Sequence, residues 1–191
     1  MKEVEIKAKL KDREAVMKKL TELGCVFDEP ITQKDVVFAR NVASLKDFRT
    51  NDVFLRIREK NGPKYLFTIK KRMSNDLDAI EYETAISSKE EMEQAILLMG
   101  YKEAIRVNKV RVITNYQGNE ICIDDVEGLG AFIEMEKLTE KGDSEKIQTE
   151  LFEFFKTLGI KPEDRVLSGY DILMWQKKEG IKQKIETKSQ L

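Results

Sequence analysis

The chain has 191 residues, 41% of them hydrophobic, which is long and apolar enough for one large domain or two small ones with a buried core. Charged residues make up 36% of the sequence, above the roughly one quarter that is usual for soluble domains, yet they cancel to a net charge of -1 and give no overall basic field for nucleic acid. Histidine is absent, which excludes Ser-His-Asp and Cys-His triads and any zinc site with histidine ligands.

The first predicted element is a strand over residues 3–8, in which side chains alternate between two faces. The aliphatic side chains fall on one face and the charged ones on the other. The charged face carries Glu3, Glu5 and Lys7, spaced by roughly 6 to 7 Å. Taken alone, such a face is explained by contact with water, as in most half-covered antiparallel sheets. An amphipathic helix over residues 12–23 follows and ends at Gly24.

Three further strands are predicted at residues 55–58, 66–70 and 80–83. In each, the charged side chains again alternate with aliphatic or aromatic ones. Asn61-Gly62, between the first two, is typical of a tight hairpin turn and so predicts an antiparallel pair. The charged positions on these strands are Arg56, Arg58, Lys70, Glu81 and Glu83.

The same alternation returns in the second half of the chain. A capping box at Ser88 predicts the start of a helix over residues 89–99, and Gln117-Gly118-Asn119 predicts another hairpin turn. Strands are predicted at residues 109–112 and 132–136. Their charged positions are Lys109, Arg111, Glu134 and Glu136.

Two amphipathic helices complete the predicted elements, one from about residue 143 to 158 and one from about residue 168 to 175. No linker rich in proline, glycine or serine divides the chain. We therefore predict one domain over residues 1–176, followed by a charged C-terminal tail over residues 177–191.

If the charged faces of these strands converge, one surface collects both glutamates and cations, and the aliphatic faces pack under the helices. A curved or closed sheet with helices outside would turn that charged surface inward, around a polar interior. Glutamates about 6 Å apart repel by roughly 3 kcal/mol at an effective dielectric constant near 20, so they require neighbouring cations or a metal. Carboxylate oxygens favour Mg²⁺ or Mn²⁺, and arginine and lysine suit a polyphosphate.

Several motifs occur in a recognisable order along the chain. They are Glu-x-Glu-x-Lys at 3–7, LRIRE at 55–59, Thr-x-Lys at 68–70, Lys-x-Arg at 109–111 and the stretch from Asp125 to Glu136. In this combination the chain resembles the CYTH superfamily, which contains class IV adenylyl cyclases and thiamine triphosphatases and is also called the triphosphate tunnel metalloenzymes. The resemblance covers about residues 1–175. It implies an α+β fold, an eight-stranded antiparallel closed β-barrel with helices packed outside.

The resemblance also implies roles for the charged residues. Phosphate binding falls to Lys7, Arg56, Arg58, Lys70, Lys109 and Arg111, and metal binding falls to Glu3, Glu5, Glu134 and Glu136. Glu81 and Glu83 are left as metal ligands or as partners that orient the cations. The expected metal is Mg²⁺ or Mn²⁺, and the residues expected at the reaction itself are Glu3, Glu5 and Lys7.

Within the superfamily, the stretch from Asp125 to Glu136 and QKDVVF at 33–38 are most similar to the class IV adenylyl cyclase branch. Two departures are Val37, where a tyrosine is usual, and Gly169, which separates Ser168 from Tyr170. The resemblance predicts conversion of ATP to cyclic AMP and pyrophosphate. Hydrolysis of thiamine triphosphate, inorganic triphosphate or a nucleoside triphosphate is the alternative, and a non-catalytic polyphosphate-binding module is the third interpretation.

The remaining expectations concern location and partners. The sequence lacks an apolar run of 18 or more residues and its charged start does not resemble a signal peptide, so we predict a cytoplasmic protein with no membrane partner. Cys25 and Cys122 lack metal-ligand spacing and are interpreted as small buried side chains. The expected partner is a small-molecule triphosphate and not a nucleic acid, with a homodimer left open.

Overall fold

The computed structural model describes residues 2–73, 75–139 and 143–180, without the side chains of residues 2 and 3. The strands within these ranges are β1 (Lys2–Lys9), β2 (Ile31–Ala39), β3 (Val53–Lys60), β4 (Lys64–Arg72), β5 (Asp78–Ile86), β6 (Lys102–Tyr116), β7 (Asn119–Val126), β8 (Gly130–Thr139) and β9 (Arg165–Val166). The helices are α1 (Arg13–Glu22), α2 (Leu45–Arg49), α3 (Lys89–Leu98), α4 (Ser144–Thr157) and α5 (Tyr170–Lys178), with a short 3-10 helix at Pro162–Asp164.

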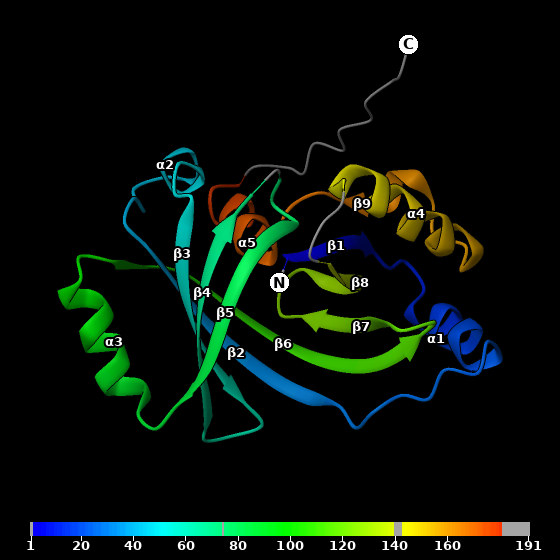
Figure 1. Ribbon diagram of the computed structural model, residues 1–191, viewed down its shortest axis with the longest axis horizontal. Helices are drawn as coiled ribbons and strands as arrows, with labels where there is room; N and C mark the ends of the chain where they lie inside the picture. Colours follow the sequence, from blue (N-terminus) through cyan, green and yellow to red (C-terminus); the bar gives the residue numbers. More distant parts are fainter. Residues whose placement is uncertain (1, 74, 140–142, 181–191) are drawn as a thin grey trace, which may run out of the picture.

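The strands form one antiparallel sheet in the order β5-β4-β3-β2-β6-β7-β8-β1-β9, and β5 also pairs with β1. This last pairing closes β1 to β8 into a barrel, while β9 adds a short strand beside β1 (Figure 1). Closure leaves the eight barrel strands paired on both sides and gives the sheet an inside and an outside. The predicted eight-stranded antiparallel closed barrel with outer helices is therefore confirmed.

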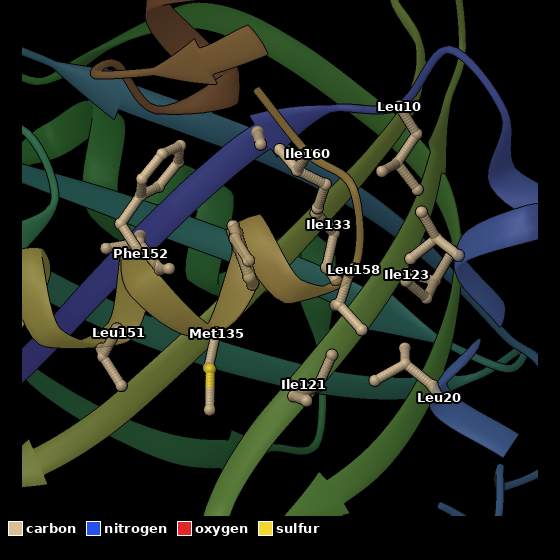
Figure 2. Packing of buried hydrophobic residues seen from close by; sticks show 14 of the residues in the cluster. Leu10, Leu20, Ile121, Ile123, Ile133, Met135, Leu151, Phe152, Leu158 and Ile160 are labelled. Atoms are coloured by element: carbon tan, nitrogen blue, oxygen red, sulfur yellow. The ribbon is translucent and has the colours of Figure 1, made fainter. Parts of the chain in front are cut away.

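Strand alternation decides which side chains lie under the helices. In β1, Val4, Ile6 and Ala8 are fully buried, and the latter two join the core beneath α1 and α4. Figure 2 shows this core, in which side chains of β7 and β8 meet those of the two helices. Burying one such aliphatic side chain contributes about 1.5 to 3 kcal/mol, so the outer positions of these strands anchor the helices. A second core fixes α3 over β2 and β3.

Helices α2 and α5 lie over one end of the barrel. Val37 and Phe54, which share the inner faces of β2 and β3 with charged residues, pack with Phe48 of α2 and Trp175 of α5. A neighbouring core joins inner-face residues of β6, β7 and β8 to Tyr170 on α5. The inner surface of the barrel thus changes along its length, from charged side chains to an apolar end that the two helices cover.

The structure contains the two predicted hairpin turns and also elements that were not predicted. The turns at Asn61-Gly62 and Gln117-Gly118 are present, and both residues of each turn have positive φ, as tight primed hairpin turns require. Strands β2, β7 and β9 and helix α2 were not among the predicted elements. Strand β9 and helix α2 are short, and both faces of β2 and β7 mix polar with apolar residues. Both cysteines are buried and free, as interpreted.

Residues 181–191, most of the predicted tail, lie outside the described residues. Just before them, Lys177 of α5 donates a hydrogen bond to the carbonyl of Gly128, and the side chain of Glu179 accepts one from the backbone of Leu45. Within the described ranges, no helix is both long and apolar enough to cross a membrane.

Candidate functional site on the inner wall of the barrel

The inner wall carries the charged side chains that sequence alternation placed on one face. On β1, Glu5 and Lys7 alternate with the fully buried outer residues. Lys7 lies directly opposite Glu134 of β8, and Arg111 of β6 lies directly opposite Asp124 of β7. Because opposite residues on antiparallel strands share a face, these pairs meet inside the barrel.

One group of these side chains is almost completely enclosed, and we call it the buried cluster. It consists of Lys7, Lys109, Arg111, Asp124 and Glu134. Lys7 lies 3.0 Å from Glu134, and the guanidinium group of Arg111 also contacts Glu134. Arg111 donates two hydrogen bonds to Asp124, at 2.7 and 2.6 Å, and Lys109 donates a third at 3.0 Å. Each charge therefore has an opposite charge within contact distance, which such burial requires.

Tyr170 of α5 joins this cluster from the covered end of the barrel. Its hydroxyl donates a hydrogen bond of 2.9 Å to Asp124, and its ring lies under two ammonium groups, with Lys7 Nζ at 4.1 Å and Lys109 Nζ at 4.8 Å from the ring centroid. The backbone carbonyl of Ser168 also accepts a contact of 3.5 Å from Lys7. The start of α5 therefore helps to position both lysines.

The pKa values in the buried cluster reflect competition between burial and neighbouring charge. Burial alone would raise the pKa of Glu134, but Lys7 and Arg111 hold it well below the ordinary value. Burial opposes the charged form of Lys7, yet Glu134 and Glu5 raise its pKa. Lys109 differs, because burial and then Arg111 lower its pKa. A ligand with negative charge would be favoured beside Lys109, where the positive charge is least compensated.

A second group lies on the other side of the barrel, and we call it the open cluster. It consists of Asp35, Arg56, Arg58, Lys70, Glu81 and Glu83 from β2 to β5. Arg58 holds Asp35 with two hydrogen bonds of 2.7 Å. Burial would raise the pKa of Asp35, but the charge and hydrogen bonds of Arg58 lower it to about 2. The cluster is more accessible than the first, because Glu83 is 40% exposed.

Glu81 and Glu83, for which two interpretations were left open, contact cations of the open cluster. Glu81 contacts Lys70 and lies 3.6 Å from Arg56, and Glu83 lies 3.4 Å from Arg56 and accepts a hydrogen bond of 2.9 Å from Thr68. Burial would raise the pKa of Glu81, but Lys70 and then Arg56 lower it. Both glutamates are thus paired with inner-wall cations in this arrangement.

Of the residues predicted to bind metal, Glu134 belongs to the buried cluster, and Glu5 and Glu136 lie beside it. Glu5 lies opposite Glu136 of β8, and Glu136 lies opposite Glu120 of β7, so three neighbouring strands carry carboxylates at one level. Glu5 also lies 3.1 Å from Lys7. The backbone of Glu3 pairs with that of Leu138, but its side chain lies outside the described residues.

This row suits a hard divalent cation by its chemistry, since its donors are carboxylate oxygens. Among the side chains that the structure describes, no three or more acidic or cysteine side chains converge closely enough to enclose a metal ion. Mg²⁺ does not need such a cage, because it is usually bound through one or two protein carboxylates together with water and substrate phosphates. The residues therefore fit a metal that the protein and a triphosphate share.

A cavity of about 330 Å³ lies along β2, β6 and β7, next to the inner-wall residues Gln33 and Lys109. Its lining also includes Lys34 and Val110, which are exposed and alternate with those residues along their strands. Because it involves the outer face of the barrel, we define the candidate site by the inner-wall charges and not by this hollow.

All six predicted phosphate-binding cations thus lie on the inner wall, divided between the two clusters. Three of their partners were not predicted from the sequence, namely Asp35, Asp124 and Tyr170. Asp35 lies within the quoted QKDVVF motif and could have been found by its alternation. Asp124 lies on the unpredicted strand β7, and Tyr170 reaches it across 46 positions of the chain.

Comparison with known proteins agrees with this architecture. A family model described as CYTH domain matches residues 1–170. The chain is 35% identical over 173 residues to a Methanocaldococcus jannaschii protein named "Putative adenylate cyclase", and the match covers 89% of this chain and 97% of the relative.

Solved structures share the fold. The PH1819 protein of Pyrococcus horikoshii superposes with a TM-score of 0.77 and 27% identity over 92% of this chain and 99% of its own. A Hippeastrum protein, whose description names an adenylyl cyclase with a dominant triphosphatase activity, has a TM-score of 0.61 and 17% identity over 97% and 98% of the two chains. The charged inner wall, the closed barrel and the match over residues 1–170 lead to one conclusion: the chain belongs to the CYTH domain family.

Proposed function

We propose that this protein is a divalent-metal-dependent enzyme that converts ATP to cyclic AMP and pyrophosphate inside the barrel. The observation that carries the proposal is the gathering of six cations on the inner wall next to a row of carboxylates. The cations match the negative charge of a triphosphate, and the carboxylates match the metal that accompanies it. The named M. jannaschii relative supports adenylate cyclisation as the first reaction to test.

In this proposal the two clusters hold the triphosphate from opposite sides. Arg56, Arg58 and Lys70 of the open cluster would bind phosphate oxygens as the ligand replaces part of their carboxylate pairing. Lys7 and Lys109 would approach it from the buried cluster, with Tyr170 beneath both ammonium groups. Held this way, the triphosphate is fixed along the wall, and only the group attached to its α-phosphate keeps freedom to be positioned.

The reaction would then form one bond and break another at the α-phosphorus. The ribose 3'-hydroxyl oxygen attacks this phosphorus and loses its proton to water, the bond to the bridging oxygen breaks, and pyrophosphate leaves with the electron pair. Lysine and arginine side chains stabilise the charge on the departing pyrophosphate. Glu3, Glu5, Glu134 and Glu136 are the proposed holders of Mg²⁺ or Mn²⁺, whose chemistry is to make the hydroxyl easier to deprotonate.

Triphosphate hydrolysis is the second candidate, because the same cations and carboxylates would bind its substrate and metal. Water would attack the terminal phosphorus of thiamine triphosphate, inorganic triphosphate or a nucleotide, and the cations would stabilise the same kind of leaving group. The description of the Hippeastrum protein shows that an adenylyl cyclase by name can carry a dominant triphosphatase activity on this fold. A non-catalytic polyphosphate-binding module would need the cations but not the row of carboxylates.

The test is a product analysis with separate substrates. The protein is incubated with ATP, inorganic triphosphate or thiamine triphosphate in the presence of Mg²⁺ or Mn²⁺, and cyclic AMP, pyrophosphate and orthophosphate are measured separately. Cyclic AMP with an equal amount of pyrophosphate supports cyclisation, and orthophosphate without cyclic AMP supports hydrolysis. Turnover that persists in excess EDTA would contradict the metal assignment, and binding without any product would leave the non-catalytic module.

A further inference from the structure

Gln33 is a buried polar residue on the inner wall that the site described above does not use. It lies on β2, directly opposite Lys109 of β6 and two residues before Asp35, so it shares their face of the barrel. Gln33 as a whole is only 4% exposed. Among the described residues, the side-chain oxygen Oε1 of Gln33 has no hydrogen-bond partner.

Such an oxygen calls for an explanation, since more than about 90% of buried polar groups in proteins are hydrogen-bonded. Lys60 of β3 and Lys109 of β6 lie directly opposite Gln33, and neither ammonium group donates a hydrogen bond to Oε1. Lys109 directs its ammonium group to Asp124 at 3.0 Å, and Arg58 directs two N–H groups to Asp35. Gln33 therefore presents an amide, with an acceptor beside a donor, at the edge of the proposed phosphate-binding surface.

The chemistry of the amide distinguishes between parts of a triphosphate ligand. Phosphate oxygens accept hydrogen bonds and would leave an amide oxygen unpaired, so the complement of Oε1 is a donor on the organic group. A purine amino edge places an N–H donor next to a ring-nitrogen acceptor, which is the pair that a glutamine amide recognises with two hydrogen bonds. Ile31, two residues earlier on the same face, adds apolar surface for a planar ring.

We propose that Gln33 is a specificity residue that binds the amino edge of adenine and selects an adenine nucleotide over inorganic triphosphate. The proposal rests on the proposed function, because the cations of the two clusters must hold the triphosphate beside Gln33. Gln33 would add recognition of the base to this binding of the triphosphate. The same amide would discriminate against inosine triphosphate, in which a carbonyl replaces the amino group.

Binding measurements on the full-length protein with Mg²⁺ test this assignment. The probes are ATP, inosine triphosphate and inorganic triphosphate, each with methylene groups in place of both bridging oxygens so that no turnover consumes them. In Gln33→Leu, the dissociation constant for the ATP analogue should rise about tenfold, as expected for the loss of a buried hydrogen bond. Affinity for the inorganic analogue should change by less than about twofold, and the preference for adenine over inosine should disappear.

Two further variants make the outcome decisive. If the Gln33→Leu variant does not fold, Gln33→Met replaces the amide with another side chain of similar length. The matched control is Lys34→Ala, which changes the adjacent outer-face residue that pairs with Glu59 at 3.3 Å. Equal weakening of all three probes in the Gln33 variants, or no change in any of them, would overturn the role of Gln33. Failure of the wild-type protein to bind any of the probes would instead overturn the proposed function, and the base-reading role with it.

Discussion

The buried and open clusters arise from the same strand alternation but have different surroundings. In the buried cluster Asp124 is fully buried and Lys7 is 2% exposed, because α1 and α4 cover the outside of the wall and Tyr170 lies over its inner end. In the open cluster the outer face of β4 and β5 leaves Ile69 and Tyr82 exposed, and Glu83 inside the barrel is 40% exposed. The two clusters thus have similar patterns of charge but differ in burial, because the helices cover them to different extents.

This difference in burial predicts how much stability each cluster loses when one of its ion pairs is broken. A buried charge that loses its partner is strongly destabilising, whereas an ion pair near the surface contributes little. We expect the buried cluster to act largely as a fixed framework and the open cluster to exchange its carboxylate partners for ligand oxygens. Four experiments, which use seven variants, test that division.

The largest effect is expected for Asp124→Asn. This carboxylate receives Lys109, Arg111 and the hydroxyl of Tyr170, so removing its charge leaves two buried cations poorly compensated. The free energy of unfolding, measured with urea, should fall by about 3 to 5 kcal/mol. Glu83→Gln is the matched change in the open cluster and should cost less than about 1 kcal/mol. Equal losses in the two variants would remove the distinction between the clusters.

The stability of the protein at acidic pH should depend on Asp35, the deeply buried carboxylate of the open cluster. Burial would raise the pKa of Asp35, but Arg58 lowers it to about 2 from an ordinary value of 3.8. A carboxyl whose pKa is lower in the folded protein adds stability above its unfolded pKa, and this stability is lost as the pH falls toward 2. We expect the difference in unfolding free energy between wild type and Asp35→Asn to shrink by about 2 kcal/mol between pH 5 and pH 2. A difference that does not depend on pH would contradict this.

A pair of changes on β1 should separate metal binding from phosphate binding. Glu5→Gln keeps the shape of the side chain but removes a negative charge, so it should weaken Mn²⁺ binding about tenfold and spare or strengthen triphosphate binding. Lys7→Met, on the same face, should weaken triphosphate binding and leave Mn²⁺ binding measurable. Each variant is titrated with Mn²⁺ and with a methylene-bridged triphosphate. If both affinities fall together in both variants, Glu5 and Lys7 do not divide these roles.

The smallest expected effect distinguishes two arginines on one strand. Arg56→Ala should weaken triphosphate binding about fivefold and leave the melting temperature nearly unchanged, because Arg56 is 19% exposed and shares its partners Glu81 and Glu83 with other groups. Arg58→Ala should weaken binding similarly but also lower the melting temperature, since it leaves Asp35 without its two charged hydrogen bonds. If triphosphate affinity is unchanged in both variants, Arg56 and Arg58 of β3 do not bind the triphosphate.

The sequence by itself determined which residues share one face of each strand. The period of a strand is local, so Glu5 and Lys7, Arg56 and Arg58, or Lys109 and Arg111 must share a face wherever the strand lies. The hairpins at Asn61-Gly62 and Gln117-Gly118 were likewise readable, because positive φ at both turn positions needs particular residues. Closure into eight strands came from the family resemblance and not from the pattern, since no local signal shows that β5 meets β1.

The tertiary structure alone decided which charges face each other. Asp124 meets Tyr170, and Lys7 meets Glu134, because strand register and the position of α5 bring distant segments together. It also decided that Val37 and Phe54, which alternation places on the same faces as Asp35 and Arg56, pack beneath α2 and α5. Alternation assigns a side chain to a face, but whether that face meets water, an opposite charge or a helix depends on contacts that no single segment encodes.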